Sequence, residues 1–382
     1  MELEGKSGHI WLEWYFVLMH SMKMEATDPK DLVYGLLGVS QLDIKPNYRR
    51  DVSVGDVYTE YVSRWLADPR SRSSEVSEPL EFLNDSGSAV AAPGFPSWVP
   101  NFEAFSQSRH RRRLSPLAGT VKKGLVTLGS FKTERFPTAA GAKLFGVGYE
   151  LENVASVSGW SIGQGRTNGE LLNFLASNHA TSRCGIPFLG VWMRLMILET
   201  DLEVSHNTAR LAFYLLHDLV SQNESPELSA DQITVQLGRT YHSPDEIEPW
   251  EAWILRSFLY RVDTDATTPD SGTINLPHKD EDMEAAAQMR LEETYGSLQD
   301  YHIFETEGGR VGVAPDGVEV GDPVCILQGC GLPLILKRKN GGNCEESEYI
   351  HFSTSLIVGL MDGEAAGIIE EKKLEPKTII IV

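Results

Sequence analysis

The C-terminal run Gly321 to Glu364 constrains the fold of this chain more than any other segment. Two short apolar segments, Val324 to Leu327 and Leu334 to Leu336, flank a Gly-Cys-Gly-Leu-Pro turn, and a third, Ile350 to Leu360, follows a Gly-Gly-Asn turn. Short apolar runs bounded by glycine, proline and asparagine are typical of β-strands joined by tight turns. The sequence therefore predicts a small β-meander in this region.

Further strands are predicted upstream of the meander. Leu125 to Leu128 and Lys143 to Val157 are rich in β-branched and aromatic residues, which favour strands. Tyr301 to Glu305 and Arg310 to Ala314 flank a Glu-Gly-Gly turn, which favours a hairpin. We expect the C-terminal strands and residues 120–157 to form a small antiparallel β-barrel-like or meander subdomain.

Helical patterns account for much of the remaining chain. Thr27 and Asp28 are candidate caps for a helix over Lys30 to Leu37, which Gly38 is expected to end. Apolar residues recur at spacings of three and four over Val54 to Leu66. Further helices are expected over Val191 to Leu202, Asn207 to Gln222, Pro249 to Arg261 and Met283 to Tyr295. The predicted fold class is α+β, with a helical body beside the β-subdomain.

Composition divides the chain into five segments. The 382 residues, 41% of them hydrophobic, are enough for one large core or two smaller ones. Two polar stretches interrupt the apolar patterns and predict a flexible connection and a linker. The expected organisation is a helical segment at 1–67, the connection at 68–97, a mixed strand and helix body at 98–262, the linker at 263–282, and a helix plus the β-meander at 283–382.

Charge limits the expected partners. The 54 acidic and 34 basic residues give a formal net charge of −20, which would repel a phosphate backbone and an anionic membrane surface. No stretch approaches the roughly 18 consecutive apolar residues of a membrane span. The basic run Arg109 to Arg113 is either a solvated loop or a site for an acidic partner or phosphate. We expect a protein or small-molecule partner and no nucleic acid; the oligomeric state stays open.

Cysteine usage indicates a reducing compartment. The four cysteines are Cys184, Cys325, Cys330 and Cys344. Their spacing matches neither a zinc knuckle nor a redox Cys-x-x-Cys motif. Asn84 and Asn223 begin Asn-x-Ser sequons, but the first residues do not have the pattern of a signal peptide. We expect a cytoplasmic protein with no metal and no cofactor.

Three segments resemble fungal heterokaryon-incompatibility proteins, in the region downstream of the family's signature domain. Ala26 to Val39 (ATDPKDLVYGLLGV) and Phe95 to Phe102 (FPSWVPNF) are the first two. In the third, the family pattern falls on Gly321, Asp322, Gly329, Cys330, Pro333, Leu334 to Leu336, Arg338 and Met361 to Ala365. The segments occur in the family's order, which makes the set more specific than any one of them.

The resemblance implies a role in fungal self/nonself recognition and regulated cell death. Since only 25 residues precede Ala26, we expect most of the signature domain to be missing. That domain resembles Toll/interleukin-receptor folds, and any nicotinamide-dinucleotide cleavage assigned to the family would be located there. The remaining chain would then act as a binding or regulatory module.

A second hypothesis is a recruited enzyme. The sequence has no nucleophile elbow, zinc-protease motif, P-loop or dinucleotide fingerprint. A cofactor-independent isomerase or cyclase of fungal secondary metabolism would need only an apolar pocket and one or two positioned acids or bases. The candidate pocket residues are Trp11, Trp14, Tyr15, Trp98 and Trp192, and the candidate acids and bases are His20, Asp322, Asp362 and Glu364.

The candidate polar residues each have a structural alternative. Asp322, Asp362 and Glu364 could bind a hard cation if they converge, or the two aspartates could close turns beside their neighbouring glycines. Cys330 could act as a nucleophile, although its position between two glycines also fits a structural role.

Overall fold

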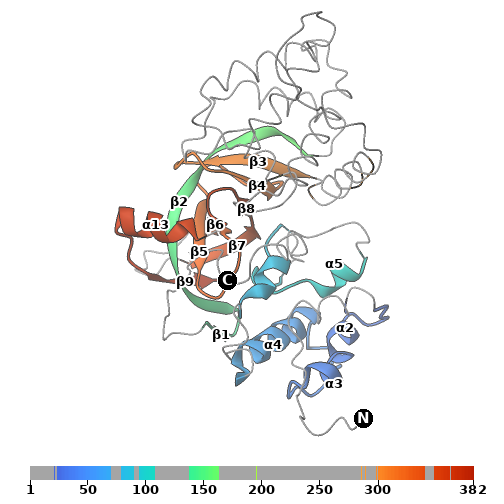
Figure 1. Ribbon diagram of the computed structural model, residues 1–382. Coiled ribbons are helices and arrows are strands. Elements are labelled where there is room, and N and C mark those ends of the chain that lie inside the picture. Colours follow the sequence, from blue (N-terminus) through green and yellow to red (C-terminus); the bar gives the residue numbers. More distant parts are fainter. Residues whose placement is uncertain are drawn as a thin grey trace, which may run out of the picture.

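The computed structural model describes residues 24–69, 79–89, 94–107, 137–162, 300–339, 348–361 and 363–382, together with five single positions. The described helices are α2 (Asp31–Tyr34), α3 (Leu37–Ser40), α4 (Val54–Ala67), the 3-10 helix η2 (Glu81–Asp85), α5 (Phe102–Gln107) and α13 (Glu364–Lys372). The strands are β1 (Thr138–Ala140), β2 (Lys143–Ser161), β3 (Tyr301–Thr306), β4 (Val311–Pro315), β5 (Pro323–Leu327), β6 (Leu334–Arg338), β7 (Glu348–Thr354), β8 (Leu356–Ile357) and β9 (Lys377–Ile381). Helices and sheet together confirm a mixed α+β fold (Figure 1).

One mixed sheet organises the described residues. Its strand order is β5-β6-β7-β9-β2-β3-β4-β8, with β1 paired to β2 and a further pairing between β2 and β5. The 19-residue strand β2 pairs with β9 through Leu144 to Gly148, with β5 through Gly148 to Asn153, and with β3 from Val154 onward. Figure 1 shows β2 running from the C-terminal strands to the β3–β4 hairpin. β2 therefore joins the two parts of the sheet.

Several predicted strands are confirmed. β5, β6 and β7 pair in chain order as an antiparallel meander, and β3 and β4 form the predicted hairpin. The predicted strand Lys143 to Val157 lies within β2 and joins the meander through β5. Leu125 to Leu128 lies outside the described residues.

The predicted barrel-like subdomain is wrong. β9 pairs in parallel with β7, so the sheet is mixed. β2 is also longer than the meander strands, and its C-terminal part continues the sheet through β3 and β4 to β8. The strands therefore do not form a separate antiparallel barrel.

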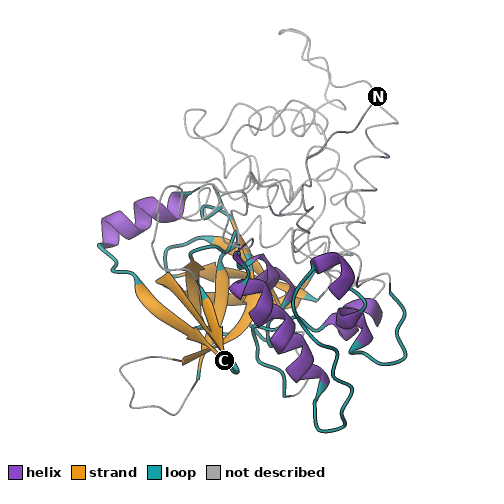
Figure 2. Cartoon of the chain, turned by 90° about the horizontal axis from the view of Figure 1, so that it is seen from below, coloured by secondary structure: helices purple, strands orange, loops and turns teal. Residues whose placement is uncertain are grey.

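The predicted helical body is not supported by the described residues. They are organised around the sheet, and α4, with 14 residues, is the longest helix among them. Figures 1 and 2 show α2 to α5 together on one side of the sheet, with α13 away from them. The predicted helices between residues 191 and 295 lie outside the part of the chain that is described, apart from single positions.

Both faces of β5 are buried, which explains why this strand is continuously apolar. In β5, Cys325 and Leu327 belong to a hydrophobic cluster with α2, α4 and η2, here called the helix-side core. The alternate residues Val324 and Ile326 belong to a second cluster with α13, the α13-side core. Because successive side chains of a strand point to opposite faces, a strand between two cores must be apolar at every position.

Helix α4 forms where its pattern predicts. Ser53 and Asp56 make a capping box: Asp56 N donates to Ser53 Oγ at 3.0 Å, and Ser53 N donates to Asp56 Oδ2 at 2.8 Å. Hydrogen bonds from Ser53 lower the pKa of the Asp56 carboxyl. The Tyr58 hydroxyl donates to Pro29 O at 2.8 Å, so α4 packs on the segment that leads into α2.

The predicted helix Lys30 to Leu37 is divided into α2 and α3. Gly38 lies within α3 instead of ending it, and Gln41 ends that helix with a left-handed φ of 54°. Asp28 does cap the entry to α2, because its Oδ1 accepts a hydrogen bond from Lys30 N at 3.0 Å.

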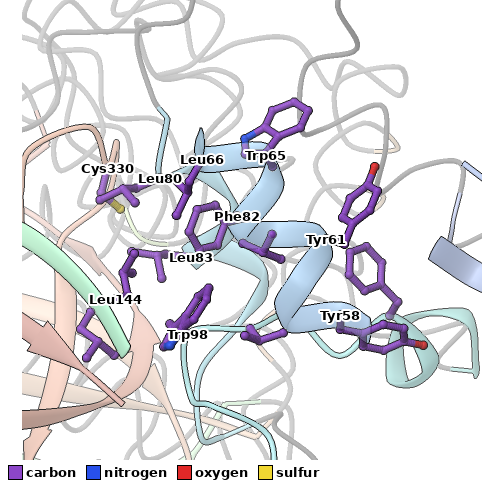
Figure 3. Close-up of a cluster of buried hydrophobic side chains, with 14 of the residues drawn as sticks. Tyr58, Tyr61, Trp65, Leu66, Leu80, Phe82, Leu83, Trp98, Leu144 and Cys330 are labelled. Atoms are coloured by element: carbon purple, nitrogen blue, oxygen red, sulfur yellow. The ribbon is translucent and has the colours of Figure 1, made fainter. Parts of the chain in front are cut away.

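Part of the stretch expected to be a flexible connection is buried. Leu80, Phe82 and Leu83 are fully buried, and Figure 3 shows Phe82 and Leu83 between α4 and Leu144 of the sheet. The Leu80 N–H donates to Gly329 O at 2.7 Å. Gly329 has a φ of 81°, and a Cβ there would lie 2.8 Å from Pro79, so glycine permits this close approach.

Trp98 anchors the segment Phe95 to Phe102 in the helix-side core. It is fully buried, and its ring lies edge-on to Phe82 with centroids 6.3 Å apart. The indole Nε1 donates to Ala142 O at 3.0 Å, which satisfies the polar atom of this large side chain.

Trp98→Ala should lower the free energy of unfolding by about 3–5 kcal/mol, because it leaves a cavity and an unpaired carbonyl. Urea denaturation measures this change. Val320→Ala is the matched control, because Val320 is 67% exposed and its truncation should change stability by less than about 0.5 kcal/mol. A Trp98→Ala loss below about 1 kcal/mol would show that this core does not stabilise the fold.

Candidate functional site

Two of the three carboxylates named from the sequence, Asp322 and Glu364, lie in the described structure. Asp322 closes the turn before β5: its N–H donates to Glu319 O at 3.1 Å, and its Oδ2 accepts from Glu319 N at 2.9 Å. Burial raises the pKa of Asp322. Glu364 is the first residue of α13, and Asp362 lies outside the described residues. Within the described ranges, no three His, Cys, Asp or Glu side chains converge as metal ligands.

The aromatic candidates are mostly beyond the described chain. Trp98 lies in the helix-side core with its polar atom satisfied. The other proposed pocket residues, together with the proposed base, lie outside the described residues: Trp11, Trp14, Tyr15, Trp192 and His20. Trp98 is therefore the one candidate pocket residue whose surroundings can be stated, and they are those of a packed core.

Both described cysteines are buried in the helix-side core. Cys325 and Cys330 form no disulfide. Burial raises the pKa of the Cys325 thiol far above its ordinary range, which opposes thiolate formation.

None of the described helices combines the length and apolar character that a membrane span requires.

The structure reveals a buried ion pair that the sequence did not single out. Arg310 Nη1 donates to Glu152 Oε1 at 2.9 Å, and Arg310 Nε donates to Gly359 O at 3.3 Å. The Glu152 side chain is 0% exposed and that of Arg310 15% exposed. A Cβ on Gly308 would lie 2.1 Å from Glu152 Oε2, so only glycine fits there. The pair ties β2 to the β3–β4 hairpin and to the loop after β8.

A second polar group lies at the rim of the sheet. Glu150 on β2 accepts hydrogen bonds from Lys377 Nζ at 2.6 Å, from Tyr349 Oη at 3.0 Å, and from Arg338. Burial alone would raise the pKa of Glu150, but the hydrogen bonds from Lys377 and Tyr349 and the charge of Arg338 outweigh it and lower that pKa. These contacts link β2 to β6, β7 and β9.

The ionisable side chain of His351 on β7 is fully buried. Its backbone N–H donates to Ser97 Oγ at 2.9 Å, and its Nε2 lies 3.1 Å from Leu83 O. A carbonyl only accepts, so Nε2 carries the proton of a neutral imidazole. Burial lowers the pKa of His351 to about 3. Its place in the apolar run Tyr-Ile-His-Phe was the sequence signal that could have identified it.

The segment Ala26 to Val39 positions an exposed loop, residues 41–53, here called the Tyr48 loop. The Tyr34 hydroxyl accepts a hydrogen bond from Asn47 N at 2.9 Å and donates to Asn47 O at 3.2 Å. The Tyr48 hydroxyl donates to Asp31 Oδ1, and the Tyr34 and Tyr48 rings lie edge-on with centroids 5.2 Å apart. The hydrogen bond to Asp31 raises the pKa of Tyr48 to about 12.

Further hydrogen bonds fix the tip of the Tyr48 loop. Lys30 Nζ donates to Arg49 O at 3.3 Å, and Arg49 N donates to Asn47 Oδ1 at 3.1 Å. The Arg49 guanidinium makes two hydrogen bonds to Asp51, at 3.0 and 2.8 Å. The polar residues of the family-like segment thus hold a loop in place; they do not line a cleft with one another.

The chain is distantly similar to heterokaryon incompatibility protein 6, OR allele, of Neurospora crassa. The two sequences are 22% identical over 368 residues, which cover 91% of this chain and 50% of that protein. This chain thus spans about half the length of that relative. No family model matches the chain, and no solved structure matches it significantly. The similarity supports, at a coarse level, the fungal resemblance carried by the three segments.

Removing one partner of the buried ion pair should be costly. Glu152→Ala leaves Arg310 buried without its carboxylate, and should lower the unfolding free energy by about 3–5 kcal/mol. In a double-mutant cycle, the variant that carries both Glu152→Met and Arg310→Met should lose less unfolding free energy than the sum of the losses in Glu152→Met alone and Arg310→Met alone. The exposed pair Glu60–Arg64 is the control, and Arg64→Ala should cost less than about 1 kcal/mol. Additive losses at residues 152 and 310 would contradict the coupling.

His351 should make stability depend on pH. The pKa of His351 is lowered in the folded state, so the unfolded chain takes up a proton from about pH 6.5 downward while the folded chain stays neutral to about pH 3. The stabilisation from the neutral imidazole is complete above about pH 6.5 and falls by up to ~1.4 kcal/mol per pH unit below it. Denaturation of wild type and His351→Gln from pH 7 to 4 measures this difference, and equal pH slopes would overturn it.

Proposed function

We propose that this chain is a binding and regulatory module of a heterokaryon-incompatibility-type protein, acting in the fungal cytoplasm in self/nonself recognition and regulated cell death. One observation carries the proposal: the three family-like segments, far apart in sequence, meet in the helix-side core. The first contributes Leu32 and Val33, the second Trp98, and the third Cys330 and Leu334. What this chain shares with the family is therefore a scaffold.

Because the residues of the three family-like segments lie in the core, we infer that the surface of the module recognises the partner. Core residues set the fold, whereas the loops that the fold displays determine which partner binds. The chain spans half of the Neurospora relative. The proposed role is therefore that of one module of such a protein, namely partner sensing or regulation.

A recruited isomerase or cyclase is not favoured. Trp98 is packed in the core, where its Nε1 donates to Ala142 O, and Asp322 closes a turn, where its Oδ2 accepts from Glu319 N. The similarity to an incompatibility protein supports the binding role instead.

A chimera tests the proposal. The aligned half of the Neurospora relative is replaced by this chain, and heterokaryons with a panel of partner strains are scored for growth arrest and cell death. We expect the chimera to trigger the reaction, with a changed set of incompatible partners. Trp98→Ala in the chimera is the control that disrupts the scaffold, and it should abolish the reaction. A chimera that accumulates normally but reacts with no partner strain would overturn the proposal.

A further inference from the structure

We propose that one face of the β3–β4–β8 part of the sheet is a docking surface for a helix of this same chain, residues 191–202. Three apolar side chains, one from each strand, form this surface, here called the Ile303 face: Ile303, Val313 and Leu356. The docking holds the chain together from within, so it would stand whether or not the chain acts in incompatibility.

The Ile303 face is a row across three paired strands. Ile303 is opposite Val313 in the β3–β4 pair, and Val313 is opposite Leu356 in the β4–β8 pair (Figure 1). Residues directly opposite each other point to the same side of a sheet, and their neighbours in sequence point to the other side. The neighbours Phe304 and Ile357 belong to the α13-side core, so the Ile303 face points away from that core.

The Ile303 face is covered, although neither of the two cores includes it. Ile303 and Leu356 are each 4% exposed, and Val313 is fully buried. None of these three residues belongs to the helix-side core or to the α13-side core. A sheet buries an apolar face by packing a further layer of side chains against it. The covering layer therefore has to come from another part of the protein.

Residues 163–299 leave the sheet and return to it beside this face. They follow Ile162, at the end of β2, and precede Asp300, at the start of β3. The Ile162 N–H donates to Tyr301 O at 2.7 Å, and the Asp300 N–H donates to Ile162 O at 3.2 Å. The segment is thus inserted between two hydrogen-bonded strands. Because it is tethered at both ends close to Ile303, its effective concentration at the Ile303 face is high.

Leu195 identifies the part of the insertion that docks. Leu195 is helical and only 3% exposed, whereas Met289, which is also helical, is 67% exposed. Spacings of four, three and four residues place an apolar stripe on one side of a helix, namely Val191, Leu195, Leu198 and Leu202. A valine and leucine stripe suits an apolar row, because both surfaces are buried without leaving polar groups unpaired.

Photo-crosslinking in the full chain tests the docking. Leu356 is replaced by p-benzoylphenylalanine, the chain is irradiated, and cross-linked tryptic peptides are identified by mass spectrometry. We expect cross-links to the two peptides that share residues 191–202, which are bounded by Arg183, Arg194 and Arg210. The same probe at Val320, which is 67% exposed, should label neither peptide.

Limited proteolysis gives a second readout. Leu195→Asp places a charge in the docked stripe, so subtilisin should cleave residues 163–299 about tenfold faster or more, because cleavage follows the population of the undocked segment. Leu356→Ala, on the sheet side, should raise the same cleavage rate severalfold. Met289→Asp is the matched control within the insertion, and it should be cleaved as slowly as wild type because Met289 is already exposed.

Three outcomes would overturn the inference. The first is a probe at position 356 that labels neither of the two peptides. The second is a probe that joins two copies of the chain into a covalent dimer, seen on a denaturing gel, because the occupant would then come from a second copy. The third is equal cleavage rates in Leu195→Asp and Met289→Asp.

Discussion

The described fold depends on the burial of the C-terminal sheet on both of its faces. β5 divides its side chains between two cores, and β6 does the same, with Leu334 and Leu336 in the helix-side core and Ile335 in the α13-side core. β5 and the first three residues of β6 have no solvent-facing side, so each of these residues is buried against one of the two cores. The N-terminal helices, the 79–89 segment and α13 are held by the same strands.

This arrangement explains the uneven use of polar residues. The buried carboxylate of Glu152 forms an ion pair with Arg310. Where a histidine is buried, its ring is neutral and bound to a backbone carbonyl. In the segment Ala26 to Val39, by contrast, Lys30, Asp31 and Tyr34 form hydrogen bonds to residues of the Tyr48 loop. Polar side chains therefore connect strands inside the sheet region, whereas in the segment Ala26 to Val39 they hold the Tyr48 loop in place.

Local patterns predicted local elements well and their assembly poorly. The α4 stripe, the β3–β4 hairpin and the β5–β6–β7 meander follow from periodicity and turn residues, which act over a few positions. The parallel β7–β9 pair and the partner changes of β2 depend on contacts between distant segments, for which spacing gives no signal. Likewise, Leu80 and Phe82 lie in a Ser- and Pro-rich stretch whose composition conceals their burial. Of the candidate site residues, Asp322 lies in a turn, as one of its two alternatives predicts. His351 was missed because it is one polar residue within an apolar run, and Glu152 because Glu150 and Asn153 beside it make that part of β2 look solvent-exposed.

The position of β9 has a consequence for how the chain reaches its native state. β9 lies between β2 and β7, and beyond it Val382 O accepts hydrogen bonds from the N–H and hydroxyl of Ser97, which is 285 residues away in sequence. The last strand in chain order thus occupies an inner place in the sheet, so pairing there requires closure of a very long loop. Contacts of such separation slow folding, and the unpaired edges of β2 and β7 stay open to other strands until β9 arrives.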